Sequence, residues 1–214
     1  MSAIASGPRL GTNGNTTAEA EPTPARAAPA IGNPGALGLA AFAITTFLLC
    51  MTSANLVNPA VTPMVLGVAL MVGGVGQVLA GMWEFRVGNT FGGTAFVMYG
   101  GFWLSFWALN QFYVKEIPAA QAGNAVGLYL IAWAMFTGLM FIASFKTNRA
   151  INMVFGLLMI TFLLLGIGNA GAHPTVIHWG GYFGLMTAAV AGYTACAVVT
   201  NETFGRTILP VRPL

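Results

Sequence analysis

The chain has 214 residues, of which only eight are basic and five are acidic, while 57% are hydrophobic. No Asp, Glu, Lys or Arg stands between Gly32 and Trp83, and no single soluble core could bury so much apolar surface. The net charge of +3 comes from scattered residues that form no basic patch, so nucleic acid is not an expected partner. The composition therefore indicates a membrane protein.

Residues 1–32 differ in kind from the rest of the chain. They are rich in Ala, Pro, Gly, Thr and Ser and show no apolar periodicity, which predicts a disordered N-terminal tail. No apolar segment of signal-peptide length follows a basic start in this stretch.

Residues 33–200 are predicted to form a transmembrane domain of six helices, because about 20 apolar residues cross a bilayer as a helix. The six apolar runs are Leu37–Asn55, Pro63–Met82, Phe91–Phe112, Ala125–Phe145, Ile151–Gly168 and Ile177–Val199. Residues 201–214 form the C-terminal tail. The predicted fold class is thus all-α and polytopic.

Basic residues indicate the orientation of these spans. With six spans, both tails and the loops after spans two and four lie on one side of the membrane. That side collects Arg9, Arg26, Arg86, Lys146, Arg149, Arg206 and Arg212, whereas the opposite side holds only Lys115. Since loops rich in Lys and Arg face the cytoplasm, both termini are expected to be cytoplasmic.

Three local patterns stand out in chain order. The first span opens with NPGALGL at residues 33–39, the third carries YGGFW at residues 99–103, and the C-terminal tail reads NETFGRTILP at residues 201–210. Together these motifs resemble the acetate uptake transporter family, the succinate–acetate permeases of bacteria and fungi. The family's opening motif is NPAPLGL, so Ala36 replaces its second proline. The resemblance runs from about Asn33 to Pro210.

The resemblance implies both a function and a site. It implies a channel or permease in the cell (plasma or inner) membrane for acetate, related monocarboxylates and succinate, assembled as a homo-hexamer with a path in each protomer. The sequence itself has no GxxxxGKS or GxxxxGKT loop, no Ser-His-Asp set and no metal-ligand spacing of its cysteines, so no enzyme activity, cofactor or metal is expected. The resemblance also implies a narrow apolar constriction, which falls on Phe42, Tyr99 and Leu158 in this chain.

Spacing along the chain agrees with such a ring. Phe42 is nine residues after Asn33, Tyr99 eight after Phe91, and Leu158 seven after Ile151. At about 1.5 Å per residue, all three lie roughly 10–14 Å into the membrane from the same side. We therefore expect one ring of bulky side chains from three helices.

Polar residues inside the spans are candidates for the substrate path. Thr45 and Thr46 share a helix face with Phe42, and their hydroxyls can either face substrate or bond back to carbonyls one turn earlier. Trp103 follows Tyr99 by four residues, and its indole N–H can serve a carboxylate or its ring can simply pack.

Further candidates lie on the second and fifth spans. Thr161 and Asn169 continue the stripe of Leu158, and Asn169 can receive an anion or cap its helix. Gln77 and Glu84 are seven residues apart on one face. A buried ionisable group is a functional candidate, but Glu84 near a span end can also pair with Arg86 or a neighbouring protomer.

The start of the first span and Glu84 are assigned gating or structural roles. Asn33 can cap the first helix, and Pro34 suits its first turn. The two cysteines, Cys50 and Cys196, show no metal or redox spacing.

The absence of basic residues inside the spans constrains the mechanism. An unpaired buried carboxylate is penalised by several kcal/mol, so either polar groups replace its water or the acid crosses protonated. About one acid molecule in several hundred is protonated at pH 7, rising tenfold per unit of acidification. Transport is therefore expected to be pH-dependent or proton-linked. Two alternatives remain open, a channel for neutral solutes such as urea or other amides, and a membrane acid sensor.

Overall fold

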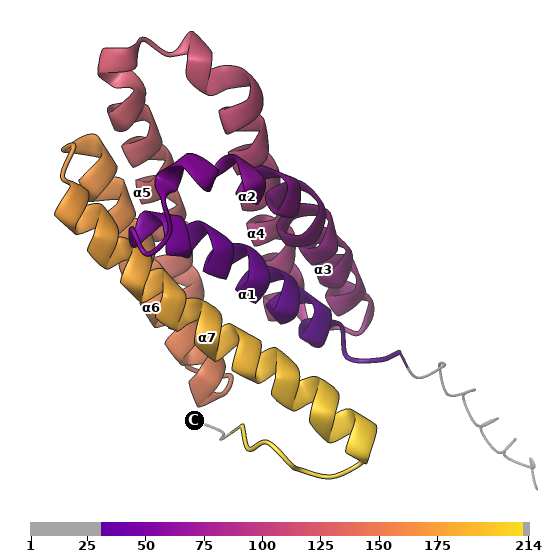
Figure 1. The fold of residues 1–214 in the computed structure, drawn as a ribbon. Helices are drawn as coiled ribbons and strands as arrows, with labels where there is room; N and C mark the ends of the chain where they lie inside the picture. The colour runs from indigo at the N-terminus through magenta and orange to yellow at the C-terminus, as the bar shows by residue number, and fades with distance from the viewer. Residues whose placement is uncertain (1–30, 212–214) are drawn as a thin grey trace, which may run out of the picture. The chain divides into compact units, whose positions relative to one another are not determined.

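The computed structural model describes residues 31–211, and this part of the chain is helical with no β-strand (Figure 1). The predicted all-α class is therefore confirmed. Apart from its last two residues, the predicted disordered tail at residues 1–32 lies outside the described residues, as do residues 212–214.

The helical elements follow one another with short turns. In order they are α1 Pro34–Ser53, η1 Pro59–Val61, α2 Pro63–Val68, η2 Ala69–Gly76, α3 Gln77–Arg86, α4 Thr90–Ala108, η3 Leu109–Tyr113, η4 Val114–Glu116, α5 Ala119–Ser144, α6 Arg149–Ala170 and α7 Pro174–Phe204. The elements η2 and η3 are π-helical, and η1 and η4 are 3-10 turns. Elements α2, η2 and α3 run on without a break and correspond to the second predicted span.

Asparagine side chains start three of the long helices. The Oδ1 atoms of Asn33, Asn89 and Asn148 accept hydrogen bonds of 3.0, 3.0 and 2.9 Å from backbone N–H groups in the first turns of α1, α4 and α6. This is the usual way to satisfy the free N–H groups of a helix start. Helix α1 begins at Pro34 as predicted, although Ala36 interrupts the family motif.

The last helix is longer than its predicted span. Helix α7 continues to Phe204, five residues beyond Val199, and stops where Gly205 adopts φ 63°. A left-handed glycine is a common helix terminator, because it has no Cβ to clash. The segment after Gly205 then folds back along α7, where Asn201 Oδ1 accepts from the backbone N–H of Ile208 and Leu209 at 2.7 and 3.0 Å.

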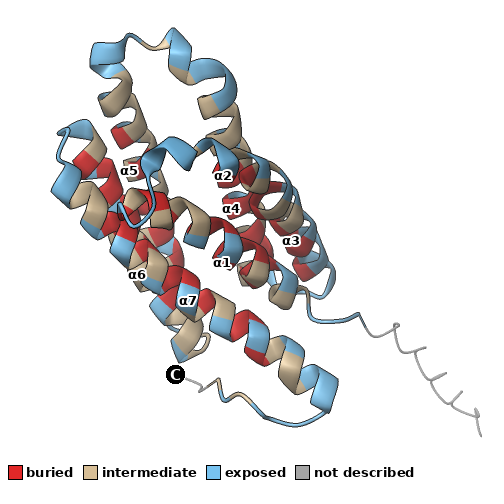
Figure 2. Cartoon of the chain, in the orientation of Figure 1, coloured by how far each residue is buried: buried red, intermediate tan, exposed pale blue. Residues whose placement is uncertain are grey.

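Five helices within residues 31–211 have the length and hydropathy to cross a membrane. They are Pro34–Ser53, Pro59–Arg86, Ala119–Ser144, Arg149–Ala170 and Pro174–Phe204. The third predicted span, now α4, is absent from this set because glycine, threonine, tyrosine and tryptophan lower its hydropathy. Helix α4 is instead rich in buried residues (Figure 2).

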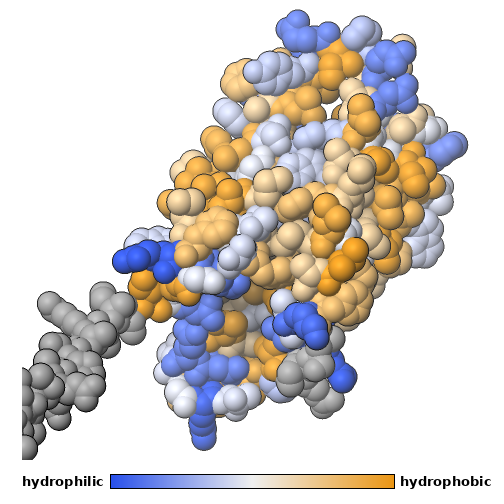
Figure 3. All heavy atoms as spheres, turned by 180° about the vertical axis from the view of Figure 1, so that it is seen from behind, coloured by the Kyte–Doolittle hydropathy of each residue, from blue (hydrophilic) through white to orange (hydrophobic). Residues whose placement is uncertain are grey.

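Apolar side chains cover the outside of the molecule. Helix α5 carries a stripe of Leu128, Met135, Leu139 and Ile142, which are 73, 71, 68 and 67% exposed and recur at helical spacing. Figure 3 shows hydrophobic atoms over the middle of one face and hydrophilic atoms gathered toward its two ends. Such a belt is unfavourable in water and is what a lipid-facing surface requires.

Glycines allow close contact between helices. A Cβ at Gly127 of α5 would lie 2.8 Å from the carbonyl oxygen of Gly166 on α6, and one at Gly181 of α7 would overlap the backbone of Ala54. These contacts lie within one chain, so both glycines allow helices of the same protomer to pack closely.

Candidate functional site

Two neighbouring cavities lie between the helices and share two lining residues. Cavity 1, of about 450 Å³, is at the N-terminal ends of α1, α4 and α6 and is lined by residues that include Asn33, Gln77, Glu84, Asn89, Tyr99, Lys146, Asn148 and Thr194. Cavity 2, of about 280 Å³, is at the C-terminal halves of the same helices and is lined by residues that include Thr46, Trp103, Asn110, Thr161 and Asn169.

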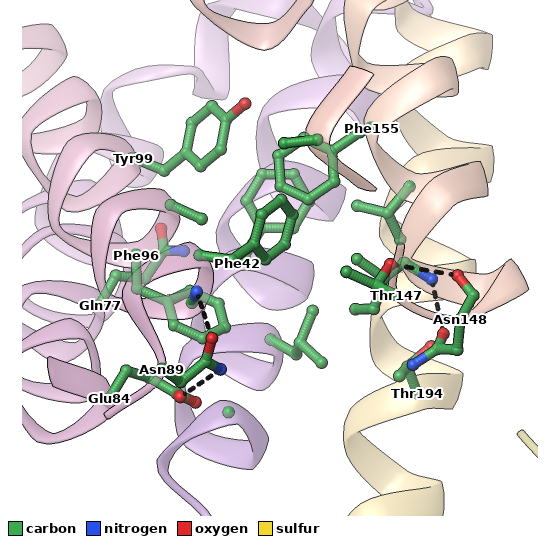
Figure 4. A pocket seen from close by; sticks show the side chains of 18 of the residues that line it. Phe42, Gln77, Glu84, Asn89, Phe96, Tyr99, Thr147, Asn148, Phe155 and Thr194 are labelled. Atoms are coloured by element: carbon green, nitrogen blue, oxygen red, sulfur yellow. Dashed lines mark hydrogen bonds between the residues drawn. The ribbon is translucent and has the colours of Figure 1, made fainter. Parts of the chain in front are cut away.

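Phe42 of α1 and Leu158 of α6 line both cavities. They are 5 and 3% exposed, so the boundary between the cavities is apolar and buried. Tyr99 of α4 lines cavity 1, and its ring centre is 6.1 Å from that of Phe42 (Figure 4). The structure thus brings together the three residues that the sequence predicted for a constriction.

The Tyr99 hydroxyl faces α5. It lies 3.0 Å from Thr137 Oγ1, and Thr137 donates its own proton to the carbonyl of Trp133 at 2.7 Å. Tyr99 must therefore be the donor to Thr137. The ring of Tyr99 is also held by Phe136 and Phe155, at centroid distances of 5.5 and 6.0 Å. Tyr99 consequently offers its aromatic ring, and not a free proton, to the site.

Three of the predicted path residues carry buried polar atoms that have no hydrogen-bond partner among the described residues. They are Thr46 Oγ1, both amide atoms of Gln77, and Trp103 Nε1. Their side chains are 4, 0 and 2% exposed, and each lines one of the two cavities. A dry buried polar group costs about 1–3 kcal/mol. We therefore infer that these atoms bind water or solute in the two cavities.

Local backbone structure positions two of these groups. Gly73 in η2 lets the Trp103 ring approach, since a Cβ there would lie 2.7 Å from the ring. The π-helical turns of η2 end at Gly76, immediately before Gln77. Wide π-turns are rare in general and recur at functional sites.

Other predicted path residues have their polar groups engaged. Thr45 and Thr161 donate to the carbonyls of Ala41 and Leu157, each at 2.9 Å, and Asn169 Nδ2 donates to Leu165 at 2.7 Å. Thr161 and Asn169 line cavity 2, whereas Thr45 lines neither cavity. Of the two roles considered for Thr45, the structure shows the hydrogen bond to a carbonyl one turn earlier.

The end of cavity 1 that is lined by exposed residues contains the starts of three helices. Asn33, Asn89 and Asn148 all line this cavity, so the N-terminal ends of three helices converge there. Helix N-termini carry partial positive charge and attract anions. The exposed Lys146 lies at the same end.

Glu84 is 4% exposed and lines cavity 1, and Asn89 Nδ2 donates to its Oε2 at 2.7 Å. Among the described residues this asparagine, rather than Arg86, is its hydrogen-bond partner. Gly35 and Gly92 leave room for the carboxylate, because a Cβ on either would lie 3.0 or 2.9 Å from its oxygens. The other predicted gating residue, Pro34, starts α1 and lines neither cavity.

Sequence reasoning missed Asn89, Asn148 and Thr137. The two asparagines had a usable signal, because each precedes an apolar run at the position of a helix cap, as Asn33 does. Thr137 had none, since it is 38 residues from Tyr99. Within residues 31–211 no three His, Cys, Asp or Glu side chains gather to hold a metal ion.

Comparison with known proteins gives consistent matches. The sequence profile of the GPR1/FUN34/yaaH family matches residues 13–214. The Succinate-acetate/proton symporter SatP of Escherichia coli (strain K12) is 39% identical over 181 residues, which cover 85% of this chain and 95% of that protein. Acetate permease A of Emericella nidulans is 39% identical over 197 residues, covering 84% of this chain and 65% of the permease.

A solved structure is also similar. The structure of the bacterial acetate channel SatP superposes with a TM-score of 0.79 at 38% identity, covering 85% of this chain and 99% of that chain.

Proposed function

Because this chain belongs to the GPR1/FUN34/yaaH family, we propose that it is a membrane channel or permease for acetate and related small monocarboxylates. Similar proteins named as an acetate permease and an acetate channel support acetate as the substrate. These relatives are transporters rather than enzymes, and the membrane-length apolar helices fit a multi-pass protein of the cell membrane.

The observation that carries this proposal is the pair of cavities that meet at Phe42 and Leu158. Each cavity contains buried polar atoms that lack a partner among the described residues. A small amphiphilic solute fits such a path, since its methyl group can pass apolar side chains while its polar end finds unpaired donors.

Phe42, Tyr99 and Leu158 are the proposed constriction. Their aromatic and aliphatic groups come from three different helices and are buried. A ring of this kind passes a two-carbon acid more readily than a larger one, and it raises the cost of a fully hydrated ion. The proposed polar binding positions along the path are Gln77 in cavity 1 and Thr46 and Trp103 in cavity 2.

The proposed topology has six spans with both termini in the cytoplasm. Helix α4 supplies the sixth span, because its 19 residues extend about 28 Å, close to the thickness of the hydrocarbon layer. Its low hydropathy is tolerable since it packs inside the bundle. Cavity 1 then opens to the cytoplasm beside Lys146. The homo-hexamer rests on the family resemblance.

The proposal is tested by reconstituting the full chain into liposomes. Protein-dependent uptake of labelled acetate is measured after subtraction of protein-free liposomes, with unlabelled acetate, propionate, succinate or urea as competitors. Acetate should compete strongly and urea only weakly, because urea has no methyl group to pass the apolar side chains of Phe42 and Leu158. No uptake above protein-free liposomes, or equal competition by urea, would reject the proposal in favour of another function.

A further inference from the structure

We propose that the side-chain amide of Gln77 binds the substrate as the undissociated carboxylic acid, and that this amide discriminates against the carboxylate. The inference rests on the proposed transport function and names the chemical form of the substrate within cavity 1. It would make Gln77 the residue that links flux to pH.

The amide of Gln77 is ready to bind a ligand. Its side chain is 0% exposed, it lines cavity 1, and neither Nε2 nor Oε1 has a hydrogen-bond partner among the described residues. Figure 4 shows it on the same side of the cavity as Tyr99 and Glu84. An amide with both ends free and fully buried is uncommon, because such groups are normally satisfied.

The chemistry of a primary amide selects for the protonated acid. An amide presents a donor and an acceptor side by side, and a carboxylic acid presents an acceptor and a donor in the same spacing. The Gln77 N–H can donate to the acid carbonyl while the acid O–H donates to Gln77 Oε1. This match holds for either orientation of the amide. A carboxylate has two acceptors, so one of its oxygens would face Oε1 with no proton between them.

The charges around Gln77 also disfavour an anion. The titratable or charged groups on its own helix and on the helices packed against it are Glu84, Arg86, Tyr99 and Cys50, and Lys146 also lines cavity 1. Glu84 lies on the same face of α3, seven residues on. Arg86 and Lys146 are exposed, and the Tyr99 proton is donated to Thr137. Cys50 lines cavity 2. No buried cation among the described residues therefore offsets a carboxylate at the amide.

The first test uses the unmodified protein in liposomes and two competitors of acetate size. Acetamide cannot ionise and carries the donor–acceptor pair, whereas methanesulfonate stays an anion across the pH range. Acetamide should inhibit protein-dependent acetate uptake with the same inhibition constant at pH 5.5 and pH 7.5. Methanesulfonate should not inhibit at either pH. Above the pKa of the acid, the total acetate needed for half-maximal uptake should rise about tenfold per pH unit.

The second test changes the amide. Gln77→Met keeps the shape and removes both hydrogen bonds, so KM expressed as undissociated acid should rise about tenfold or more and acetamide inhibition should disappear. Gln77→Glu presents the same donor–acceptor pair when protonated, so uptake should recover only at acid pH. Gln121→Met is the matched control, because Gln121 is exposed on α5 and lines neither cavity.

Glu84 provides the remaining comparison, because it is the other group on this face whose charge changes with pH. The dependence on undissociated acid should persist in Glu84→Gln, whatever that change does to the rate. If uptake by Glu84→Gln no longer depended on the concentration of undissociated acid, the pH response would be assigned to Glu84 and not to Gln77.

The outcomes separate the two proposals. If the unmodified protein carries no acetate, both fail. If it carries acetate but methanesulfonate competes as well as acetamide, or Gln77→Met retains the KM and the acetamide inhibition of the unmodified protein, only the role of Gln77 is overturned. The competitor experiment needs no variant, so poor folding of Gln77→Met would not leave the proposal untested.

Discussion

Tyr99 donates its hydroxyl proton to Thr137 Oγ1 at 3.0 Å, which ties the proposed constriction on α4 to α5. The ring, in contrast, faces Phe42 at a centroid distance of 6.1 Å. The two ends of this side chain therefore have separate tasks, anchoring at the hydroxyl and narrowing the path at the ring.

Tyr99→Phe and Tyr99→Ala should separate these tasks. Loss of the hydroxyl should lower the free energy of unfolding by about 1 kcal/mol, while the remaining ring still excludes larger acids. Loss of the ring should cost about 3–5 kcal/mol and raise the uptake of propionate or lactate relative to acetate. Thermal unfolding in detergent and uptake across a series of acids measure the two effects. A phenylalanine variant that admits larger acids would contradict the division.

Leu158→Ala should widen the boundary between the cavities. The buried leucine contributes to the walls of both, so its truncation should join them and raise uptake of lactate or succinate relative to acetate. A stability loss of about 2–5 kcal/mol is expected. Leu163→Ala is the control, because Leu163 is on the same helix and 37% exposed. An unchanged acid preference in Leu158→Ala would argue against its place in the constriction.

Asn89 connects Glu84 to the first turn of α4, since it donates to the carboxylate at 2.7 Å and accepts from the Gly92 N–H at 3.0 Å. Asn89→Ala removes both bonds and should cost about 2 kcal/mol or more. Asn58→Ala removes a cap bond of 2.9 Å at η1, where the residue lines neither cavity, and should cost about 1 kcal/mol or less. Thermal unfolding of both variants, and of Asn89→Ala combined with Glu84→Gln, measures the coupling. Additive losses in the double variant would mean that the two side chains do not cooperate.

Asn201 holds the segment that follows α7. Its side chain accepts from the N–H groups of Ile208 and Leu209 and donates to the Leu209 carbonyl at 2.8 Å, while Tyr193 donates to the Pro210 carbonyl. Asn201→Ala should release this segment, so trypsin should cut after Arg206 several times faster in the folded protein. Glu202→Ala, at the exposed neighbouring position, serves as the control. Equal cleavage of both variants would show that Asn201 does not hold the segment.

Part of the candidate site could be predicted from the sequence, because the family motifs imply the constriction residues and the helical rise predicts similar depths for them. The structure places Phe42, Tyr99 and Leu158 of three different helices in the lining of cavity 1, with the ring centres of Phe42 and Tyr99 6.1 Å apart. The same reasoning did not separate Thr45 from Thr46. One residue rotates a helix position by about 100°, and only the structure shows that Thr45 bonds back to Ala41.

The sequence did not predict side-chain hydrogen bonds that depend on how the chain turns between two helices. Glu84 is bonded to Asn89 because Gly88, at φ 84°, reverses the chain and returns Asn89 to the end of α3. The number of spans depends on α4, whose packing is likewise not evident from the sequence alone. Its glycine, threonine, tyrosine and tryptophan residues lower its hydropathy, yet its burial between other helices removes the need for a strongly apolar surface.

The proposed binding of the undissociated acid at Gln77 has a consequence for the energetics of transport. A passage that admits only the neutral acid makes the concentration of that form equal on the two sides of the membrane. The membrane potential does not act on this movement directly, because the solute carries no charge. Total acetate would then accumulate on the more alkaline side, about tenfold for each unit of pH difference. A cell with an alkaline interior in an acidic medium would take up acetate through such a protein, and the same protein would release it when the gradient is reversed.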